Sequence, residues 1–148
     1  MFPNQTVLSG GSAGAITALY VSYALDDFGI ERPLVAATIS NYGGFIGTNA
    51  DAADFIEEDF GVINTDSYYY AEGPVYLAHA TGDDTVPFAL AQDIADRAVA
   101  IGHPHRTFFL DAERHGFPVL TTEVEPGVTV FEDQIRWLDE VLIGVPAG

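Results

Sequence analysis

The sequence predicts an α/β domain built on a parallel sheet of about four strands with flanking helices. Short, nearly continuous apolar runs alternate with longer segments of helical periodicity, which is typical of βαβ units. A length of 148 residues, with 48% hydrophobic residues, is enough for one core. No repeat or linker divides the chain. We therefore expect residues 1–148 to form a single domain.

The N-terminal half contributes two of the expected strands. Thr6–Ser9 is short and apolar, and it precedes a helix over Ala13–Leu25. That helix is apolar nearly all round, so we expect it to be covered on more than one side. After a connection over Asp26–Pro33, the apolar run Leu34–Ser40 suits a buried parallel strand. Residues 41–73 are the least regular part of the chain.

The C-terminal half supplies the other two strands and two helices. Val75–His79 is the third expected strand, and Arg106–Leu110 is the fourth. Between them, Thr85 and Pro87 favour a helix start and Gly102 favours its end. A final amphipathic helix is indicated by four apolar residues at helical spacing: Phe131, Ile135, Leu138 and Leu142.

The composition excludes some partners. The formal net charge is −17, and all five basic residues are arginines. Phosphate backbones and anionic membranes repel such a chain, so we expect no nucleic-acid partner. An acidic surface without lysine fits two alternatives equally: a protein from a halophilic or marine source, or an ordinary acidic protein.

The chain has no cysteine, which excludes disulfides, zinc–thiolate sites and cysteine nucleophiles. No apolar run reaches membrane-spanning length. The first residues, MFPNQT, do not form the basic and then apolar pattern of a signal peptide. The sequence does not indicate the cellular compartment.

The stretch VLSGGSAG, residues 7–14, could hold either a phosphate or a nucleophilic serine. A dinucleotide-binding loop requires the spacing G-x-G-x-x-G. Counted from Gly10, the other two positions are Ser12 and Ala15, and the second strand ends in Ser40 and Asn41 rather than an acidic residue. A P-loop fails because there is no lysine. The nucleotide-binding interpretation is the weaker of the two.

The nucleophile interpretation is supported by three stretches. Residues Gly10, Gly11, Ser12, Ala13 and Gly14 fit G-x-S-x-G, whose tight turn requires small neighbours around the serine. HATGDDTVPF, residues 79–88, follows the third strand, and RHGFP, residues 114–118, follows the fourth. The order Ser12, Asp83, His115, each after a strand of one parallel sheet, is that of a catalytic triad.

These three stretches resemble the C-terminal half of an α/β-hydrolase of the carboxylesterase, lipase and feruloyl-esterase kind. LSGGSAGA resembles the nucleophile elbow, HATGDDTVPF the acid loop and HGF the histidine loop, with Ala80 where the family commonly has glycine. The resemblance implies hydrolysis of carboxylic esters without a cofactor or metal. It implies Ser12 as nucleophile, His115 as general base and Asp83 as the residue orienting the imidazole. The Ala13 N–H would donate one oxyanion hydrogen bond.

Other roles remain open for several of these residues. Ser12 could instead cap a helix. Asp84 and, more weakly, Asp111 compete with Asp83 for the acid role. His79 is expected to brace the acid loop, and we expect exposure to solvent for His103 and His105. Two further segments are ambiguous: the acidic stretch 51–59, better explained as a solvated helix face than a metal site, and Tyr68–Tyr70, which could line an acyl pocket or only pack.

The chain departs from the family at its N-terminal side. The family has about four strands and a glycine-rich loop before the elbow, whereas the elbow strand here begins near residue 6. The second oxyanion donor belongs to the missing loop, and losing one donor typically costs about 10²–10³ in turnover. A non-catalytic remnant or binding domain is therefore the main alternative. The elbow strand would also lie at an open sheet edge, and we expect association through it, as a homodimer.

Overall fold

Four parallel strands form the central sheet of the computed structural model. They are β1 (Val7–Gly11), β2 (Ala37–Asn41), β3 (Val75–Ala80) and β4 (His105–Leu110), in the spatial order β1-β2-β3-β4. The predicted fold class is confirmed. The structure describes residues 6–25, 29–31, 33–44 and 74–143. Because the strands are parallel, their carboxyl ends meet at one edge, where ligands bind in open α/β sheets.

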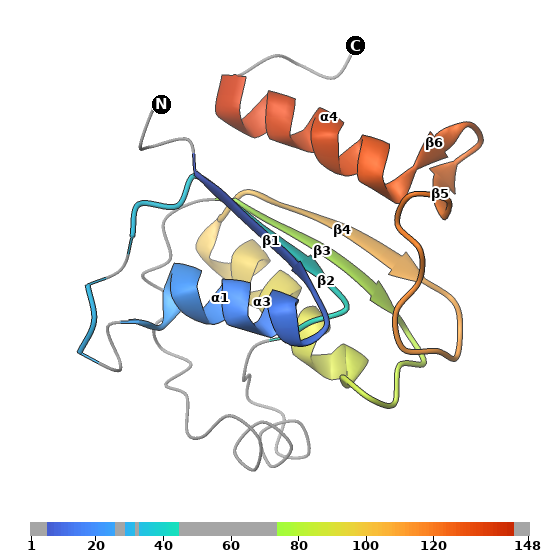
Figure 1. Cartoon of the computed structure of the whole chain (residues 1–148), viewed down its shortest axis with the longest axis horizontal. Helices are drawn as coiled ribbons and strands as arrows, with labels where there is room; N and C mark the ends of the chain where they lie inside the picture. The colour runs from blue at the N-terminus through green and yellow to red at the C-terminus, as the bar shows by residue number, and fades with distance from the viewer. Residues whose placement is uncertain (1–5, 26–28, 32, 45–73, 144–148) are drawn as a thin grey trace.

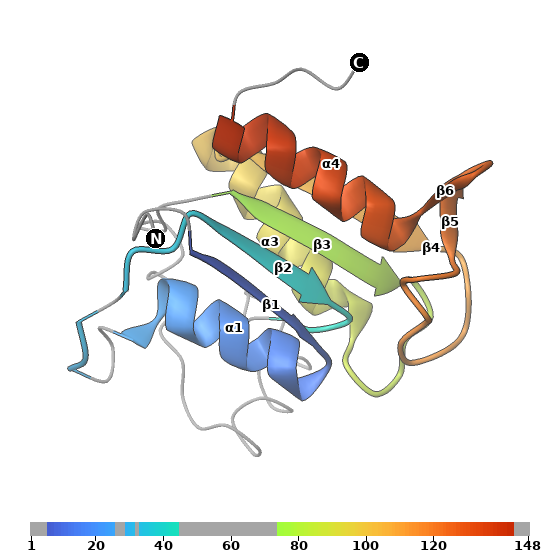
Figure 2. The same cartoon turned by 45° about the horizontal axis from the view of Figure 1, so that its top comes forward.

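Helices cover both faces of this sheet. α1 (Ala13–Tyr23) and α3 (Phe88–Ile101) lie on one face, and α4 (Val130–Ile143) lies on the other (Figures 1 and 2). The first face buries an aliphatic cluster from α1, β3 and α3 that includes Leu19, Leu77, Leu90 and Ile94. The α4 face buries a more aromatic cluster that includes Tyr76, Phe117 and Trp137. The three layers give the sheet two hydrophobic cores.

The predicted elements exist, with shifted ends. β1 extends to Gly11, beyond the predicted end at Ser9. β2 starts at Ala37 and not at the predicted Leu34, which lies outside the strand and is 65% exposed. α1 is buried along one side, and Thr17 is exposed. α3 ends where expected, since Gly102 has a φ of 69° and its N–H bonds back to the last turn.

A short hairpin was not predicted. It pairs β5 (Glu123–Glu125) with β6 (Val128–Thr129) in antiparallel fashion. Its turn contains Pro126-Gly127, and Gly127 has a φ of 80°. The Pro-Gly dipeptide is the signal that could have predicted this turn.

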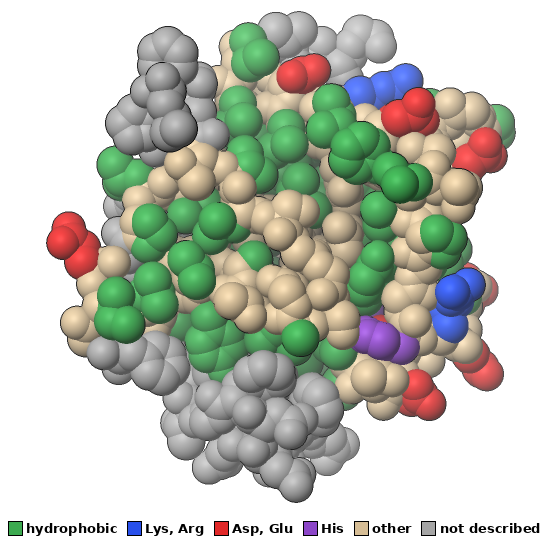
Figure 3. Space-filling model, viewed as in Figure 1, with side chains coloured by type: hydrophobic (Ala, Val, Ile, Leu, Met, Phe, Trp, Pro, Cys, Tyr) green, Lys and Arg blue, Asp and Glu red, His purple; other side chains and the backbone are tan. Residues whose placement is uncertain are grey.

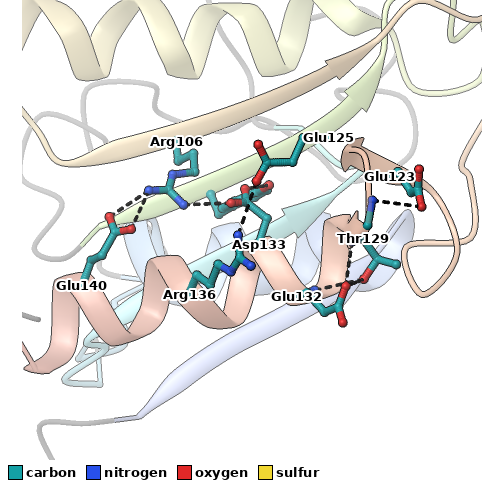
Figure 4. A network of polar contacts seen from close by, with 10 residues as sticks. Arg106, Glu123, Glu125, Thr129, Glu132, Asp133, Arg136 and Glu140 are labelled. Carbon is teal, nitrogen blue, oxygen red and sulfur yellow. Dashed lines mark hydrogen bonds and ion pairs between the residues drawn. The ribbon is translucent and has the colours of Figure 1, made fainter. Parts of the chain in front are cut away.

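Polar contacts fix α4 at its start and along its length (Figure 4). The Thr129 amide donates to the Glu132 carboxylate at 2.8 Å, and the Glu132 amide donates to the Thr129 hydroxyl at 3.2 Å. This reciprocal pair is a capping box. The Arg106 guanidinium on β4 donates to Asp133 at 3.0 Å and to Glu140 at 2.8 Å. These bonds hold α4 against the sheet.

The outer edge of β1 is unpaired within the described part of the chain, as expected from the sequence. In Figure 1 this strand lies in front of the others, and Figure 3 shows the same side as a mixture of hydrophobic side chains with backbone and other side chains, with acidic side chains towards its margins. Association through this edge stays a prediction. Among the described helices, none has the length and hydropathy needed to cross a membrane.

Candidate active site

Ser12 lies on a sharp turn between β1 and α1. Its backbone has φ 54° and ψ −121°, a conformation that costs about 1–3 kcal/mol for a residue with a side chain. The Ser12 amide donates to the Asn41 carbonyl at 2.9 Å, which joins the turn to the end of β2. The Ser12 side chain makes no capping hydrogen bond to α1, so the helix-cap alternative is wrong.

The three glycines around Ser12 differ in what they require. A Cβ on Gly10 would lie 2.3 Å from the carbonyl carbon of Gly14, so α1 can approach β1 only because Gly10 has no side chain. A Cβ on Gly11 would lie 3.1 Å from Cε2 of Tyr42. A Cβ on Gly14 would meet nothing within 4 Å. The expectation that space demands glycine on both sides of the serine therefore holds for Gly10 and not for Gly14.

Asp83 is held by its own loop after β3. Its carboxylate is fully buried, and its Oδ1 accepts hydrogen bonds from the Thr85 amide at 2.9 Å and the Val86 amide at 3.0 Å. These two bonds form an Asx-type turn at the start of α3. They fix the carboxylate so that Oδ2 points towards the histidine loop.

His115 lies between Ser12 and Asp83. Its Nδ1 is 2.8 Å from Oδ2 of Asp83, and its Nε2 is 2.7 Å from Oγ of Ser12. With the Nδ1 proton donated to the carboxylate, Nε2 is free to accept the serine proton. The three side chains singled out in the sequence therefore form one continuous hydrogen-bonded relay at the carboxyl edge of the sheet.

Backbone contacts join the acid loop to the histidine loop. The Thr81 amide donates to the Leu110 carbonyl at 2.9 Å, and the Gly82 amide donates to the Ala112 carbonyl at 3.0 Å. A Cβ on Gly82 would lie 3.0 Å from Cα of Glu113 and 3.1 Å from the Ala112 oxygen. Gly82 thus allows the two loops to approach closely enough for Asp83 to reach His115.

The Ala13 amide lies in the first turn of α1, where backbone N–H groups have no partner within the helix. The amides of Ala15 and Ile16 both donate to the Ser12 carbonyl at 3.0 Å. No residue in the described ranges accepts a hydrogen bond from the Ala13 amide. Within those ranges the Ala13 N–H therefore has no acceptor, and it lies directly after Ser12 in the chain.

The competing acidic residues lie outside the relay. Asp84 and Asp111 are both exposed, whereas Asp83 makes the contact with His115. His79 does contact the acid loop, since its Nε2 is 2.8 Å from the Val86 carbonyl.

The other two histidines are at the amino end of β4, away from the site. His103 and His105 are half-buried, so the expectation of exposure was wrong, because His105 begins the strand instead of lying in a loop.

One residue next to the relay was not singled out in the sequence. The Tyr42 ring lies 6.1 Å from the His115 ring, edge to face at 79°. Its signal in the sequence is weak, because an isolated tyrosine before Gly43-Gly44 has no specific chemical pattern. Residues 51–59 and Tyr68–Tyr70 lie outside the described residues. Within the described residues there is no group of three metal-ligating side chains.

No protein-family model matches the chain, and no curated protein matches it. Several solved structures do match the chain. MGS-M1, an alpha/beta hydrolase enzyme from a Medee basin deep-sea metagenome library, is 20% identical with a TM-score of 0.65, over 97% of this chain and 57% of that one. An esterase of the Planctomycetes species Thermogutta terrifontis is 22% identical with a TM-score of 0.62, over 96% of this chain and 55% of that one.

A Mycobacterium tuberculosis puromycin-hydrolyzing peptidase is 20% identical with a TM-score of 0.66, over 99% of this chain and 23% of that one. The chain therefore spans little more than half the length of the first two proteins. At these identities the likeness establishes the fold.

Proposed function

We propose that this chain, whose fold is that of the α/β-hydrolases from the nucleophile elbow to the C-terminal helix, is a serine hydrolase that cleaves carboxylic esters. One observation carries the proposal. Ser12 Oγ, held on a strained turn, lies 2.7 Å from His115 Nε2, and His115 Nδ1 lies 2.8 Å from a buried carboxylate oxygen of Asp83. A strained backbone together with such a relay is typical of a functional site.

The relay makes the serine hydroxyl nucleophilic. A serine hydroxyl is a weak nucleophile until a base accepts its proton. As Oγ of Ser12 attacks the ester carbonyl carbon, its proton passes to Nε2 of His115. Asp83 stabilises the resulting imidazolium through Nδ1. The same proton then goes to the departing alkoxide, which leaves as the alcohol, and the acyl group stays on Ser12.

Water completes the cycle. His115 accepts a proton from a water molecule that attacks the acyl-enzyme, and Ser12 regains its proton as the acid leaves. Negative charge forms on the carbonyl oxygen in both steps, and the Ala13 N–H at the start of α1 is the donor available to it. The helix dipole of α1 favours charge at the same place.

The descriptions of similar structures support an ester as the substrate. This substrate class is part of the proposal. One is called an alpha/beta hydrolase enzyme and another an esterase, at 20% and 22% identity. A third is called a puromycin-hydrolyzing peptidase, so an amide substrate belongs in the test. A small-molecule ester is the substrate class we favour.

A non-catalytic domain that keeps the three residues is the second candidate. The observation that favours it is the oxyanion site, where Ala13 is the one candidate donor among the described residues. Removing one of two donors typically lowers turnover by about 10²–10³. A hydrolase that lacks one donor would still form the acyl-enzyme on Ser12 slowly, whereas a non-catalytic domain would not form it at all.

The test uses a fluorophosphonate probe and a short-chain chromogenic ester, with the corresponding chromogenic amide alongside. Ser12→Ala removes the nucleophile. Ser9→Ala is the matched control, because Ser9 is an exposed serine three residues earlier in β1. We expect wild type and Ser9→Ala to be labelled and to hydrolyse the ester, and Ser12→Ala to do neither.

The outcomes separate the candidates. Labelling that disappears only in Ser12→Ala supports the serine hydrolase. A folded wild type that is never labelled overturns it in favour of the non-catalytic domain. Amide turnover exceeding ester turnover would overturn the substrate class alone. Stabilisation of the fold by a dinucleotide would instead revive the nucleotide-binding interpretation.

A further inference from the structure

Tyr42 occupies a strained turn directly after β2. Its φ of 49° lies in the left-handed region, which residues with side chains seldom adopt. Its amide donates to the Ala78 carbonyl at 2.7 Å. A Cβ on the next residue, Gly43, would lie 2.4 Å from Cβ of Ala15 in α1. The chain is therefore packed closely against α1 immediately after Tyr42.

The conformation directs the Tyr42 side chain onto the histidine loop. The ring meets His115 edge to face, with centroids 6.1 Å apart, and meets Phe117 at 5.3 Å. The Tyr42 hydroxyl donates to the Phe117 carbonyl at 3.0 Å. Burial raises the pKa of Tyr42, which keeps the hydroxyl protonated as a donor. The ring and the hydroxyl thus contact both ends of the segment 115–117.

The elbow and the histidine loop both lie against this ring. A Cβ on Gly11 would lie 3.1 Å from Cε2 of Tyr42, and a Cβ on Gly116 would lie 3.5 Å from its Cδ2. Gly116 also has a φ of 70°, which glycine adopts without strain. The Tyr42 ring therefore lies between the turn that carries Ser12 and the loop that carries His115.

We propose that Tyr42 is a positioning residue for His115, an inference that rests on the proposed function. The bond from Nδ1 to Asp83 does not by itself stop the imidazole from swinging, and a swing bends that bond and moves Nε2 away from Ser12. The Tyr42 ring and its hydrogen bond to the Phe117 carbonyl restrict this swing, so that Nε2 stays directed at Oγ of Ser12. A displacement of the imidazole by about 1 Å can lower the rate of the reaction by about 10²-fold.

The rate of acylation measures this positioning. Tyr42→Ala removes the ring and most of the side-chain volume. Tyr42→Leu also removes the aromatic ring but keeps most of the buried volume. We expect both to lower the fluorophosphonate labelling rate and kcat by about 10- to 100-fold, with KM nearly unchanged because His115 acts on the reacting atoms. Tyr42→Phe keeps the ring contact and should recover most of the rate.

Tyr76→Phe is the matched control. It also removes a tyrosine hydroxyl bond, to Asp133 at 2.7 Å, and keeps a ring packed edge to face on Trp137. That bond lies under α4 and away from the relay. We expect Tyr76→Phe to lower the urea midpoint without changing the labelling rate. Folded Tyr42→Ala and Tyr42→Leu proteins that label at the wild-type rate would overturn the proposal.

A spectroscopic measurement decides the question even if the protein proves inactive. The Nδ1 proton of His115, bonded to Asp83, should give a low-field proton resonance, identified by its loss in His115→Gln. We expect this resonance in wild type, Tyr42→Phe and Tyr76→Phe, and its broadening or loss in Tyr42→Leu. An unchanged resonance in Tyr42→Leu would overturn the positioning role, whereas absent labelling of wild type would overturn only the hydrolase.

Discussion

His79 Nε2 lies 3.3 Å from Oδ2 of Asp83, the same carboxylate oxygen that His115 Nδ1 reaches at 2.8 Å. His79 is 1% exposed and its Nε2 is 2.8 Å from the Val86 carbonyl. Burial lowers the pKa of His79, and this effect outweighs the opposing attraction of Asp83. The buried imidazole is therefore neutral at neutral pH.

We predict that the protein loses stability on mild acidification because of His79. The folded pKa lies below the unfolded value of about 6.5, so the unfolded chain binds more protons below that pH. The free energy of unfolding should be fully retained above about pH 6.5 and fall as the pH drops towards the folded pKa. Urea unfolding at pH 7.5 and pH 5.5 measures the difference.

His79→Gln is the control, since its side-chain amide can still donate to the Val86 carbonyl but does not titrate. Its unfolding free energy should depend less on pH across the same interval. An equal dependence in this variant would contradict the assignment of the effect to His79.

The two adjacent aspartates of the acid loop should differ sharply in activity. Asp83→Asn leaves the shape of the loop but removes the charge that orients His115, and comparable changes lower kcat by about 10⁴. Asp84 is exposed, so Asp84→Asn should change kcat little. Ester turnover of both variants at one pH checks this. Equal losses in the two variants would contradict the assignment of Asp83.

The two glycines that flank Ser12 should respond in opposite ways to alanine. Gly10→Ala would place Cβ 2.3 Å from the Gly14 backbone, so we expect loss of the folded elbow and of soluble protein. Gly14→Ala meets no atom within 4 Å and lies in a helix, where alanine is more stable than glycine by about 0.5–1 kcal/mol. Urea midpoints of both variants test the contrast, and a destabilised Gly14→Ala would contradict it.

The sequence predicted the sheet and the relay because both follow from local chemistry. Apolar runs of strand length are read directly, and parallel strands must bring their carboxyl ends together, so Ser12, Asp83 and His115 were placed at one edge. Tyr42 could not be found this way. The role that we propose for it depends on a left-handed turn and on the close approach of Gly43 to Ala15, a contact between distant segments that no local pattern reveals.

Salt should stabilise this protein. With a formal net charge of −17, the folded chain repels itself, and the Debye length falls from about 10 Å at 0.1 M to about 3 Å at 1 M salt. We predict that Tm rises between 0.05 M and 1 M KCl. A non-ionic osmolyte of equal osmolarity is the control, because it does not screen charge. A Tm that falls or stays constant in KCl would contradict adaptation to high salt.

The outer edge of β1, which pairs with no strand among the described residues, predicts association of two copies. Thr6 accepts from the Ala36 amide and the Ser12 amide donates to Asn41, so alternate residues face β2, and Ser9 points its backbone outwards. Ser9→Pro removes an outward N–H without breaking a bond to β2, whereas Ser9→Ala keeps it. We expect light scattering to give a dimer for wild type and Ser9→Ala, and a monomer for Ser9→Pro. A wild-type monomer at every concentration would exclude the association.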